Sequence, residues 1–204
     1  MLRKLAPAVA LMLGTATTAW GQATGTPSFN APYRAFVRHE VGGTISFPEG
    51  GGTALEGQYR FGYRAFDIGL RGGIFFPSGA ADDRFLVGAE GRGRVLTHTE
   101  QFPLDGALVV GAGFNFNGGT VFAAPVGLSL GRRLTIEDSQ ISIVPYVQPT
   151  GFLTNSPGIG GRDTDFLFAV GLGADFRLSQ VFDARISVGL GDVEGVSISA
   201  VWVR

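Results

Sequence analysis

Between residues 164 and 204 the chain alternates between apolar and polar side chains with a period of two. In the stretch DFLFAVGLGADFRL, Phe166, Phe168, Val170 and Leu172 share one parity, while charged residues and glycines share the other. This period is that of a β-strand, whose successive side chains point to opposite faces. The stretches VFDARISVGL and EGVSISAVWV repeat the pattern after short polar links. We therefore predict three antiparallel strands that turn directly back on one another.

The same alternation recurs along the rest of the chain, between turn sequences such as PEGGG at 48–52 and NGG at 117–119. It predicts seven further strands, at residues 34–47, 53–63, 66–76, 84–96, 105–116, 121–132 and 141–152. The last of these contains Pro145 and Pro149, which cannot donate to a ladder, so we expect irregular pairing there. Residues 153–164 are predicted to be the longest loop. Ten strands result, or eight if segment 141–152 and one neighbour do not span.

The N-terminus has the features of a secretory signal. Arg3 and Lys4 precede an apolar run that ends in small residues, so residues 1–23 are predicted to be a cleaved signal peptide. Residues 24–33 are rich in Gly, Thr, Ser and Pro and form a leader, and residues 34–204 form a single domain. No later stretch has about 20 consecutive apolar residues, which excludes a helical membrane protein. Because the exported chain has no Cys, its stability depends on packing and hydrogen bonds rather than on disulfides.

The charge balance narrows the possible partners. Without Arg3 and Lys4, 14 of the 16 basic residues remain beside 17 acidic ones, a net charge of −3. This near-balance argues against a nucleic-acid partner. Every remaining basic residue is Arg, whose planar guanidinium can hold carboxylates in a confined space.

A sheet of ten strands needs a closed edge, and the polar face indicates how it closes. In a soluble barrel the oily face would point inward and the charges outward. Here the charges are mixed in sign and the cations are all Arg, which is typical of an enclosed polar lumen, and glycines within the strands permit a tight curve. We predict an all-β, closed, antiparallel, up-and-down transmembrane β-barrel. The candidate lumen charge network comprises Arg38, Glu40, Glu56, Arg60, Asp67, Arg71, Glu90, Arg92, Arg94, Asp175, Arg177, Asp183 and Arg185.

The aromatic residues on the oily face fall near the two ends of the strands. Trp and Tyr, with Phe, gather at both membrane interfaces of such barrels. With the mature N-terminus in the periplasm, segment 153–164 would lie outside the cell and segment 97–104 in the periplasm. The predicted upper girdle comprises Phe47, Phe76, Phe85, Phe114, Phe116, Phe122 and Phe166. The predicted lower girdle comprises Phe61, Tyr63, Phe66, Phe176, Phe182 and Trp202.

The signal peptide, the alternating strands and the closing stretches VGLGADFRLS, FDARISVGLG and GVSISAVWV resemble the small bacterial outer-membrane β-barrel proteins over essentially the whole mature chain. The resemblance implies an outer-membrane location in a Gram-negative bacterium and a porin-like architecture. Its motifs are generic and mark architecture rather than activity. Members of the family usually end on an aromatic residue, whereas here Val203 and Arg204 follow Trp202.

We find no catalytic, cofactor-binding or metal-ligating constellation in the sequence. The chain has two histidines: His39 lies on the oily parity of its strand, and His98 lies in a link. An omptin-like protease needs acids beside a histidine at the outer rim, whereas His98 is predicted on the opposite side from Asp82 and Asp83. The sparse His and absent Cys also disfavour a transition-metal site.

Our leading hypothesis is a non-enzymatic outer-membrane barrel with a charge-filled lumen and a structural or weak binding role. Within the lumen, Glu90 and Arg92 are predicted to reach Asp67 and Arg71 on the neighbouring strand. The alternative is a small pore for ions or small solutes, and a third interpretation is a soluble periplasmic barrel that binds an apolar ligand. Outer-membrane lipid is the expected partner, and the sequence identifies no protein partner.

Overall fold

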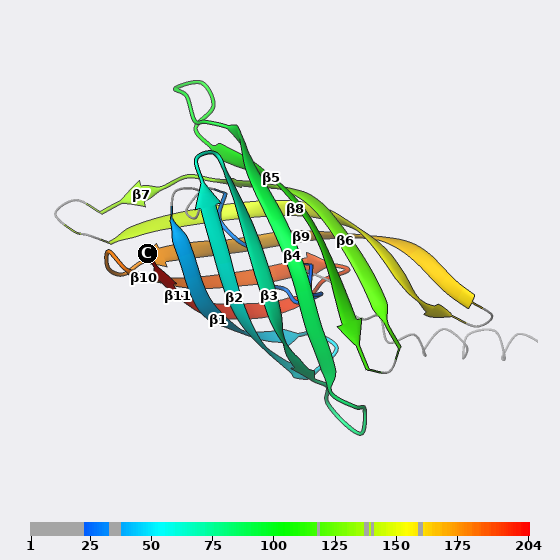
Figure 1. Cartoon of the computed structure of the whole chain (residues 1–204). Coiled ribbons are helices and arrows are strands. Elements are labelled where there is room, and N and C mark those ends of the chain that lie inside the picture. Colours follow the sequence, from blue (N-terminus) through cyan, green and yellow to red (C-terminus); the bar gives the residue numbers. More distant parts are fainter. Residues whose placement is uncertain (1–22, 33–37, 118, 137–138, 140, 159–160) are drawn as a thin grey trace, which may run out of the picture.

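Antiparallel strands, each paired with its sequence neighbour, curve into a closed barrel in the computed structural model (Figure 1). The structure describes residues 23–32, 38–117, 119–136, 139, 141–158 and 161–204. The strands are β1 (His39–Pro48), β2 (Thr53–Tyr63), β3 (Phe66–Phe76), β4 (Arg84–Leu96), β5 (Asp105–Phe116), β6 (Val121–Gly131), β7 (Leu134–Thr135), β8 (Ser142–Gly158), β9 (Gly161–Arg177), β10 (Phe182–Gly191) and β11 (Gly195–Val203).

Two ladders close the barrel. β1 pairs with β11 from Glu40 opposite Val203 to Pro48 opposite Gly195, and β6 pairs with β8. The two-residue β7 pairs with β8 and stands outside this circuit. The predicted closed antiparallel barrel is therefore confirmed with ten strands, and the eight-strand alternative is wrong. Among the described residues there is no helix long and apolar enough to cross a membrane.

The strand boundaries differ from the sequence prediction mainly at one hairpin. The predicted loop at 153–164 is wrong, because β8 continues to Gly158 and β9 begins at Gly161. Polar cross-strand contacts extend the ladder despite the turn-like composition: the Asn155 side-chain amide donates to the Thr164 hydroxyl at 3.0 Å, and Arg162 donates to the Asn155 carbonyl at 3.1 Å. The start of the first predicted strand, residues 34–37, lies outside the described residues.

The proline-containing strand is irregular on one side, as predicted. β8 pairs continuously with β9, but its ladder with β6 is interrupted between the pairs Gly127–Thr150 and Leu130–Val147. Pro149 lies inside this interruption and has no N–H to donate.

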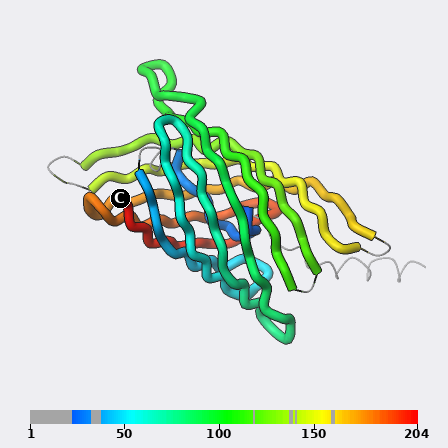
Figure 2. The backbone as a smooth tube through the Cα atoms, in the orientation of Figure 1, coloured from blue at the N-terminus to red at the C-terminus, as the bar shows by residue number. Residues whose placement is uncertain are grey.

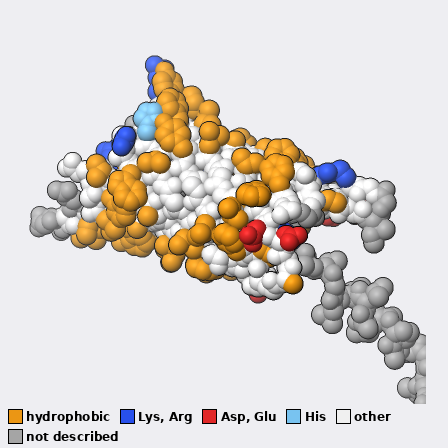
Figure 3. Space-filling model, turned by 60° about the horizontal axis from the view of Figure 1, so that its bottom comes forward, with side chains coloured by type: hydrophobic (Ala, Val, Ile, Leu, Met, Phe, Trp, Pro, Cys, Tyr) orange, Lys and Arg blue, Asp and Glu red, His pale blue; other side chains and the backbone are white. Residues whose placement is uncertain are grey.

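The barrel is apolar outside, and most of its charged wall residues point inside. Leu70 on β3 is 56% exposed and Ile198 on β11 is 54% exposed, whereas the intervening alternate positions are buried and polar, as at Asp67 with 1% exposure. Hydrophobic side chains cover much of the barrel surface in Figure 3, and the charged ones in that view lie toward its ends. Because successive side chains of a strand point to opposite faces, the period of two in the sequence sorts oily residues outward and charged residues inward.

Candidate functional site

The lumen holds most of the charged residues that the sequence analysis assigned to it. Each lies on the inward parity of its strand, so closing the sheet removes its side chain from solvent. Ten are buried, with at most 4% exposure: Glu40, Glu56, Arg60, Asp67, Arg71, Glu90, Arg92, Asp175, Asp183 and Arg185.

The other three predicted members lie near the barrel end where β1 begins and β9 ends. Arg177 is half-buried and its Nε lies 3.4 Å from Asp183. Arg38 is half-buried and donates to the Gln180 carbonyl at 3.0 Å. Arg94 is exposed at the end of β4, so its assignment to the lumen is wrong. The inward parity continues to Arg94, but the wall no longer encloses that position.

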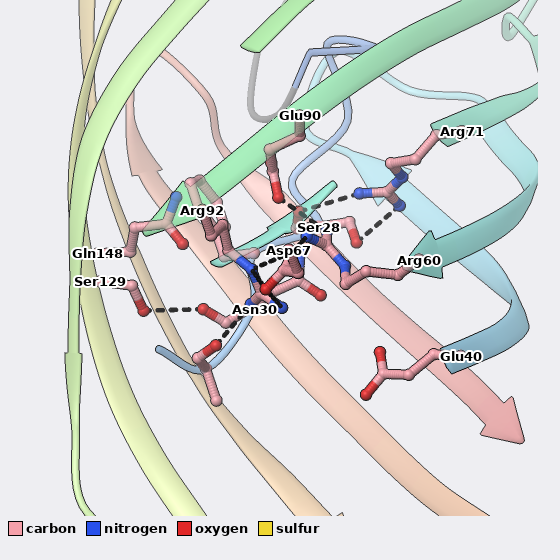
Figure 4. A network of polar contacts seen from close by, with 12 residues as sticks. Ser28, Asn30, Glu40, Arg60, Asp67, Arg71, Glu90, Arg92, Ser129 and Gln148 are labelled. Carbon is pink, nitrogen blue, oxygen red and sulfur yellow. Dashed lines mark hydrogen bonds and ion pairs between the residues drawn. The ribbon is translucent and has the colours of Figure 1, made fainter. Parts of the chain in front are cut away.

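The first ion-pair cluster joins β2, β3 and β4. Arg60 bonds Asp67 and reaches Glu90 with its second terminal nitrogen at 2.8 Å. Arg92 lies directly opposite Asp67 in the ladder, and its Nη2 is 3.0 Å from the Asp67 Oδ2. Figure 4 shows these side chains converging inside the barrel. One carboxylate is thus shared between two guanidinium groups, an arrangement that compensates for the loss of hydration.

A second cluster spans the seam between β1 and β11. Arg185 on β10 holds both carboxylate oxygens of Glu40 at 2.7 Å and lies 3.2 Å from Asp175 on β9. Arg71 on β3 contacts Glu56 on β2 at 3.4 Å. These pairs tie β1, β9 and β10 together, and β2 to β3, from inside the barrel.

Residues 23–32 thread through the lumen and are buried along their whole length (Figure 2). The sequence analysis treated this stretch as a leader ahead of the barrel domain. It carries no charge and offers hydrogen-bond acceptors to the wall. Arg71 donates to the Ser28 hydroxyl at 2.9 Å and Arg92 donates to the Ala31 carbonyl at 2.6 Å. The segment therefore satisfies guanidinium N–H groups that the ion pairs leave over.

Further wall side chains hold the same segment. The Tyr146 hydroxyl donates to the Phe29 carbonyl at 2.7 Å, and Ser129 donates to the Asn30 carbonyl at 2.8 Å. Ser187 donates to the Pro27 carbonyl at 3.0 Å and accepts from the Phe29 amide at 3.2 Å. Backbone groups of a segment outside any ladder thus find partners on β6, β8 and β10.

Inward-facing glycines make room for the segment on five strands. A Cβ at Gly171 would overlap the Phe29 ring, and one at Gly113 would overlap the Ala23 carbonyl. Other close approaches involve Gly88, where a Cβ would lie 2.9 Å from Ala23, Gly189, where it would lie 3.2 Å from Pro27, and Gly131, where it would lie 3.2 Å from Pro32. The wall therefore has glycines, and no side chains, where the segment approaches it most closely.

The lumen has an apolar side as well as a charged one. Phe29 and Ala31 of the segment belong to a buried cluster with wall residues Ala123, Val144, Tyr146, Phe152, Ala169 and Val193. These wall residues belong mostly to β6, β8 and β9, whereas the charged clusters lie on β1 to β4, β9 and β10, so β9 contributes to both. The segment therefore contacts both an apolar and a charged part of the wall.

The aromatic residues predicted for the girdles all lie on the outer face, exposed or half-buried. Cross-strand neighbours at one end include Phe85 with Phe116, and at the other Tyr63 with Phe66, whose rings lie 5.5 Å apart. His39 also lies on the outer face, with its ring 4.8 Å from that of Phe61. Their place at a membrane interface remains a prediction.

The sequence analysis did not predict a contact between His98 and Asp105. His98 Nδ1 lies 3.0 Å from Asp105 Oδ2, and the His98 amide donates to the same carboxylate at 3.1 Å. Asp105 begins β5, so folding the link back onto that strand creates a contact between residues that the sequence placed in separate elements. No group of three His, Cys, Asp or Glu residues that could hold a metal ion occurs within the described ranges.

Sequence reasoning missed the segment at 23–32 and its partners Ser129, Tyr146 and Ser187. The one available signal was the glycines on the polar parity of β4, β5, β9 and β10, where a filled lumen would otherwise place side chains. Their number indicated crowding inside the barrel but not which part of the chain would occupy the space.

No protein-family model and no curated protein matches this chain. Among solved structures, it is similar to a chain from "De novo design of transmembrane beta-barrels", with 13% sequence identity and a TM-score of 0.40, over 86% of this chain and 98% of that chain.

Proposed function

We propose that the protein is a non-enzymatic β-barrel of the outer membrane whose lumen is closed and whose role is structural or weakly binding. The observation that carries the proposal is the inverted polarity of the wall. Ten charged side chains are buried inside, while large apolar residues such as Leu70, Val126 and Ile198 are more than half exposed outside.

Lipid is the medium that suits such an exterior. Exposed apolar area on this scale is unfavourable in water, whereas a bilayer core requires it. A bilayer core also requires that backbone N–H and C=O groups be hydrogen-bonded within the protein. Closure through β1–β11 and β6–β8 meets this requirement, because it leaves no unpaired strand edge in the circuit. The third interpretation, a soluble periplasmic barrel, requires the opposite polarity.

Export supports the outer membrane rather than another bilayer. The predicted signal peptide at 1–23 directs the chain out of the cytoplasm, and the predicted aromatic girdles match the two interfaces of that membrane. Residues 1–22 lie outside the described residues, so this step rests on the sequence.

The arrangement of ionisable groups supports a non-enzymatic role. Arg60, Arg92 and Arg185 are each engaged by wall carboxylates, and the Arg71 guanidinium is shared between Glu56 and Ser28. Groups held in such pairs stabilise the wall and are not poised for proton transfer or nucleophilic attack.

A small pore is the second candidate, and the charged wall favours it. A ten-stranded barrel is wider than the roughly eight-stranded ones whose own side chains just fill the interior. In this structure the extra width is occupied by residues 23–32.

Fractionation and flotation test the proposal. Membranes from producing cells should retain the protein after alkaline washing, and the refolded protein should float with lipid vesicles. Recovery as a stable monomer from the aqueous periplasmic fraction without detergent would refute membrane residence. Hydrolytic activity lost on replacing His98 would refute the non-enzymatic role.

A further inference from the structure

We propose that residues 24–32 are a removable plug and that their departure opens a water-filled channel that prefers cations. This inference rests on the proposed membrane barrel and adds a gated passage to it. Four observations carry it: how the segment is attached, what remains when it leaves, the shape of the wall behind it and the charge of that wall.

The segment is attached without being part of the barrel. Its contacts with the wall run through side chains, such as Arg71 to Ser28, Tyr146 to Phe29 and Thr26 to Glu56 at 2.7 Å. None of the ladders that close the sheet includes residues 23–32. The barrel can therefore remain closed around its circumference when the segment moves.

The wall charges remain compensated without the segment. Arg60 and Arg92 keep Asp67, and Arg185 keeps Glu40 and Asp175. What the arginines lose is neutral acceptors, namely carbonyls and a hydroxyl, which water can replace at small cost. No charged wall group loses its counter-ion when the segment leaves. Displacing the segment therefore costs much less free energy than breaking an ion pair.

The wall cannot fill the vacated space by itself. Where the segment is thickest, at Phe29, the wall presents Gly171, and at Thr24 and Pro27 it presents Gly88 and Gly189. Glycine has no side chain to swing inward. Removing the segment therefore leaves a continuous passage rather than a repacked core.

The charge of the passage sets its selectivity. Among the described residues in its wall, seven carboxylates are buried, those of Glu40, Glu56, Asp67, Glu90, Asp105, Asp175 and Asp183. Four guanidinium groups are buried, those of Arg60, Arg71, Arg92 and Arg185, and the half-buried Arg38 and Arg177 bring the arginines to six. The excess of carboxylates attracts small cations and repels anions.

Two variants displace the segment by different routes. Gly171→Leu places a side chain where the Phe29 ring lies, and Phe29→Ala removes the ring without touching the barrel wall. Gly57→Leu is the matched control, because a Cβ there points to the outer face and its nearest neighbour, the Gly72 carbonyl oxygen, lies 3.9 Å away. A difference in mobility on SDS gels between heated and unheated samples verifies that each variant has folded.

Two measurements follow the plug and the pore separately. Amide hydrogen exchange in detergent should show residues 24–32 protected in the wild type and in Gly57→Leu, with that protection lost in the other two while the strands stay protected. In planar bilayers under a KCl gradient, the wild type should carry almost no current. Gly171→Leu and Phe29→Ala should carry a steady current, and its reversal potential should lie near the equilibrium potential of K⁺.

Each outcome decides a specific part of the inference. Free exchange of residues 24–32 in the wild type, or a wild-type current as large as that of Phe29→Ala, refutes the plug. Folded variants that release the segment but carry no current refute the channel, and reversal near the chloride potential refutes its cation preference. Failure to insert into lipid counts against the proposed membrane function, while the exchange result still decides the plug.

Discussion

Replacing Arg92 with Met removes a buried cation whose partners remain in place. The Arg92 guanidinium contacts Asp67 at 3.0 to 3.2 Å and the Ala31 carbonyl at 2.6 Å, and both charged side chains are at most 2% exposed. Removing one partner of a buried pair costs about 3–5 kcal/mol, against about 0–1 kcal/mol for an exposed pair. Because Arg60 still holds Asp67, we expect a value near the lower end, about 3 kcal/mol.

Urea unfolding in lipid vesicles measures this cost, and the same strand supplies a control. Arg94 follows Arg92 on the same parity but is exposed, so Arg94→Met should change stability by no more than about 0.5 kcal/mol. The double variant Asp67→Leu and Arg92→Met should be more stable than the two single costs imply, by about 1–3 kcal/mol, because it leaves no unpaired charge at that site. If Arg92→Met costs no more than Arg94→Met, or if the two single costs simply add, the buried-network argument is wrong.

Three further expectations follow from the outer face and the loops. Val87 points outward near the start of β4, two residues from Phe85, and is 45% exposed. Val87→Arg should therefore lower stability in bilayers by less than the about 2–4 kcal/mol of a midplane site but measurably, and a harmless substitution would contradict a lipid-facing surface. A cysteine at Ser156 should react with a membrane-impermeant reagent on intact cells, whereas one at Thr99 should not, and the reverse pattern would invert the topology. A hydrogen bond and charge repulsion from Glu194 raise the pKa of Glu49 above its ordinary value of 4.5. The folded state therefore binds this proton more tightly, and its stabilising contribution is present in acid and lost as the pH rises through the raised pKa. Glu49→Gln should thus be more stable than the wild type at neutral pH but not in acid, and an equal difference at both pH values would refute the coupling.

The sequence by itself determined the strands, the orientation of their faces and the position of most turns. Alternation is a local property, since each side chain's face depends only on its place in its own strand. This is why Leu70 and Asp67 could be assigned to opposite faces from the sequence. The same locality explains the error at 153–164, where composition indicated a loop but cross-strand bonds between Asn155, Arg162 and Thr164 extended the hairpin.

Only the tertiary structure decided which charges pair and what fills the lumen. Arg185 holds Glu40 from 145 residues away, and this contact exists because β1 and β10 both flank β11 in the closed barrel. Barrel geometry also leaves Arg94 outside the enclosed region, although its parity is inward. The segment at 23–32 has neither charge nor alternation, so no local pattern marks its position. It is held by glycines and polar groups from strands across the whole sheet, which come together only when the barrel closes.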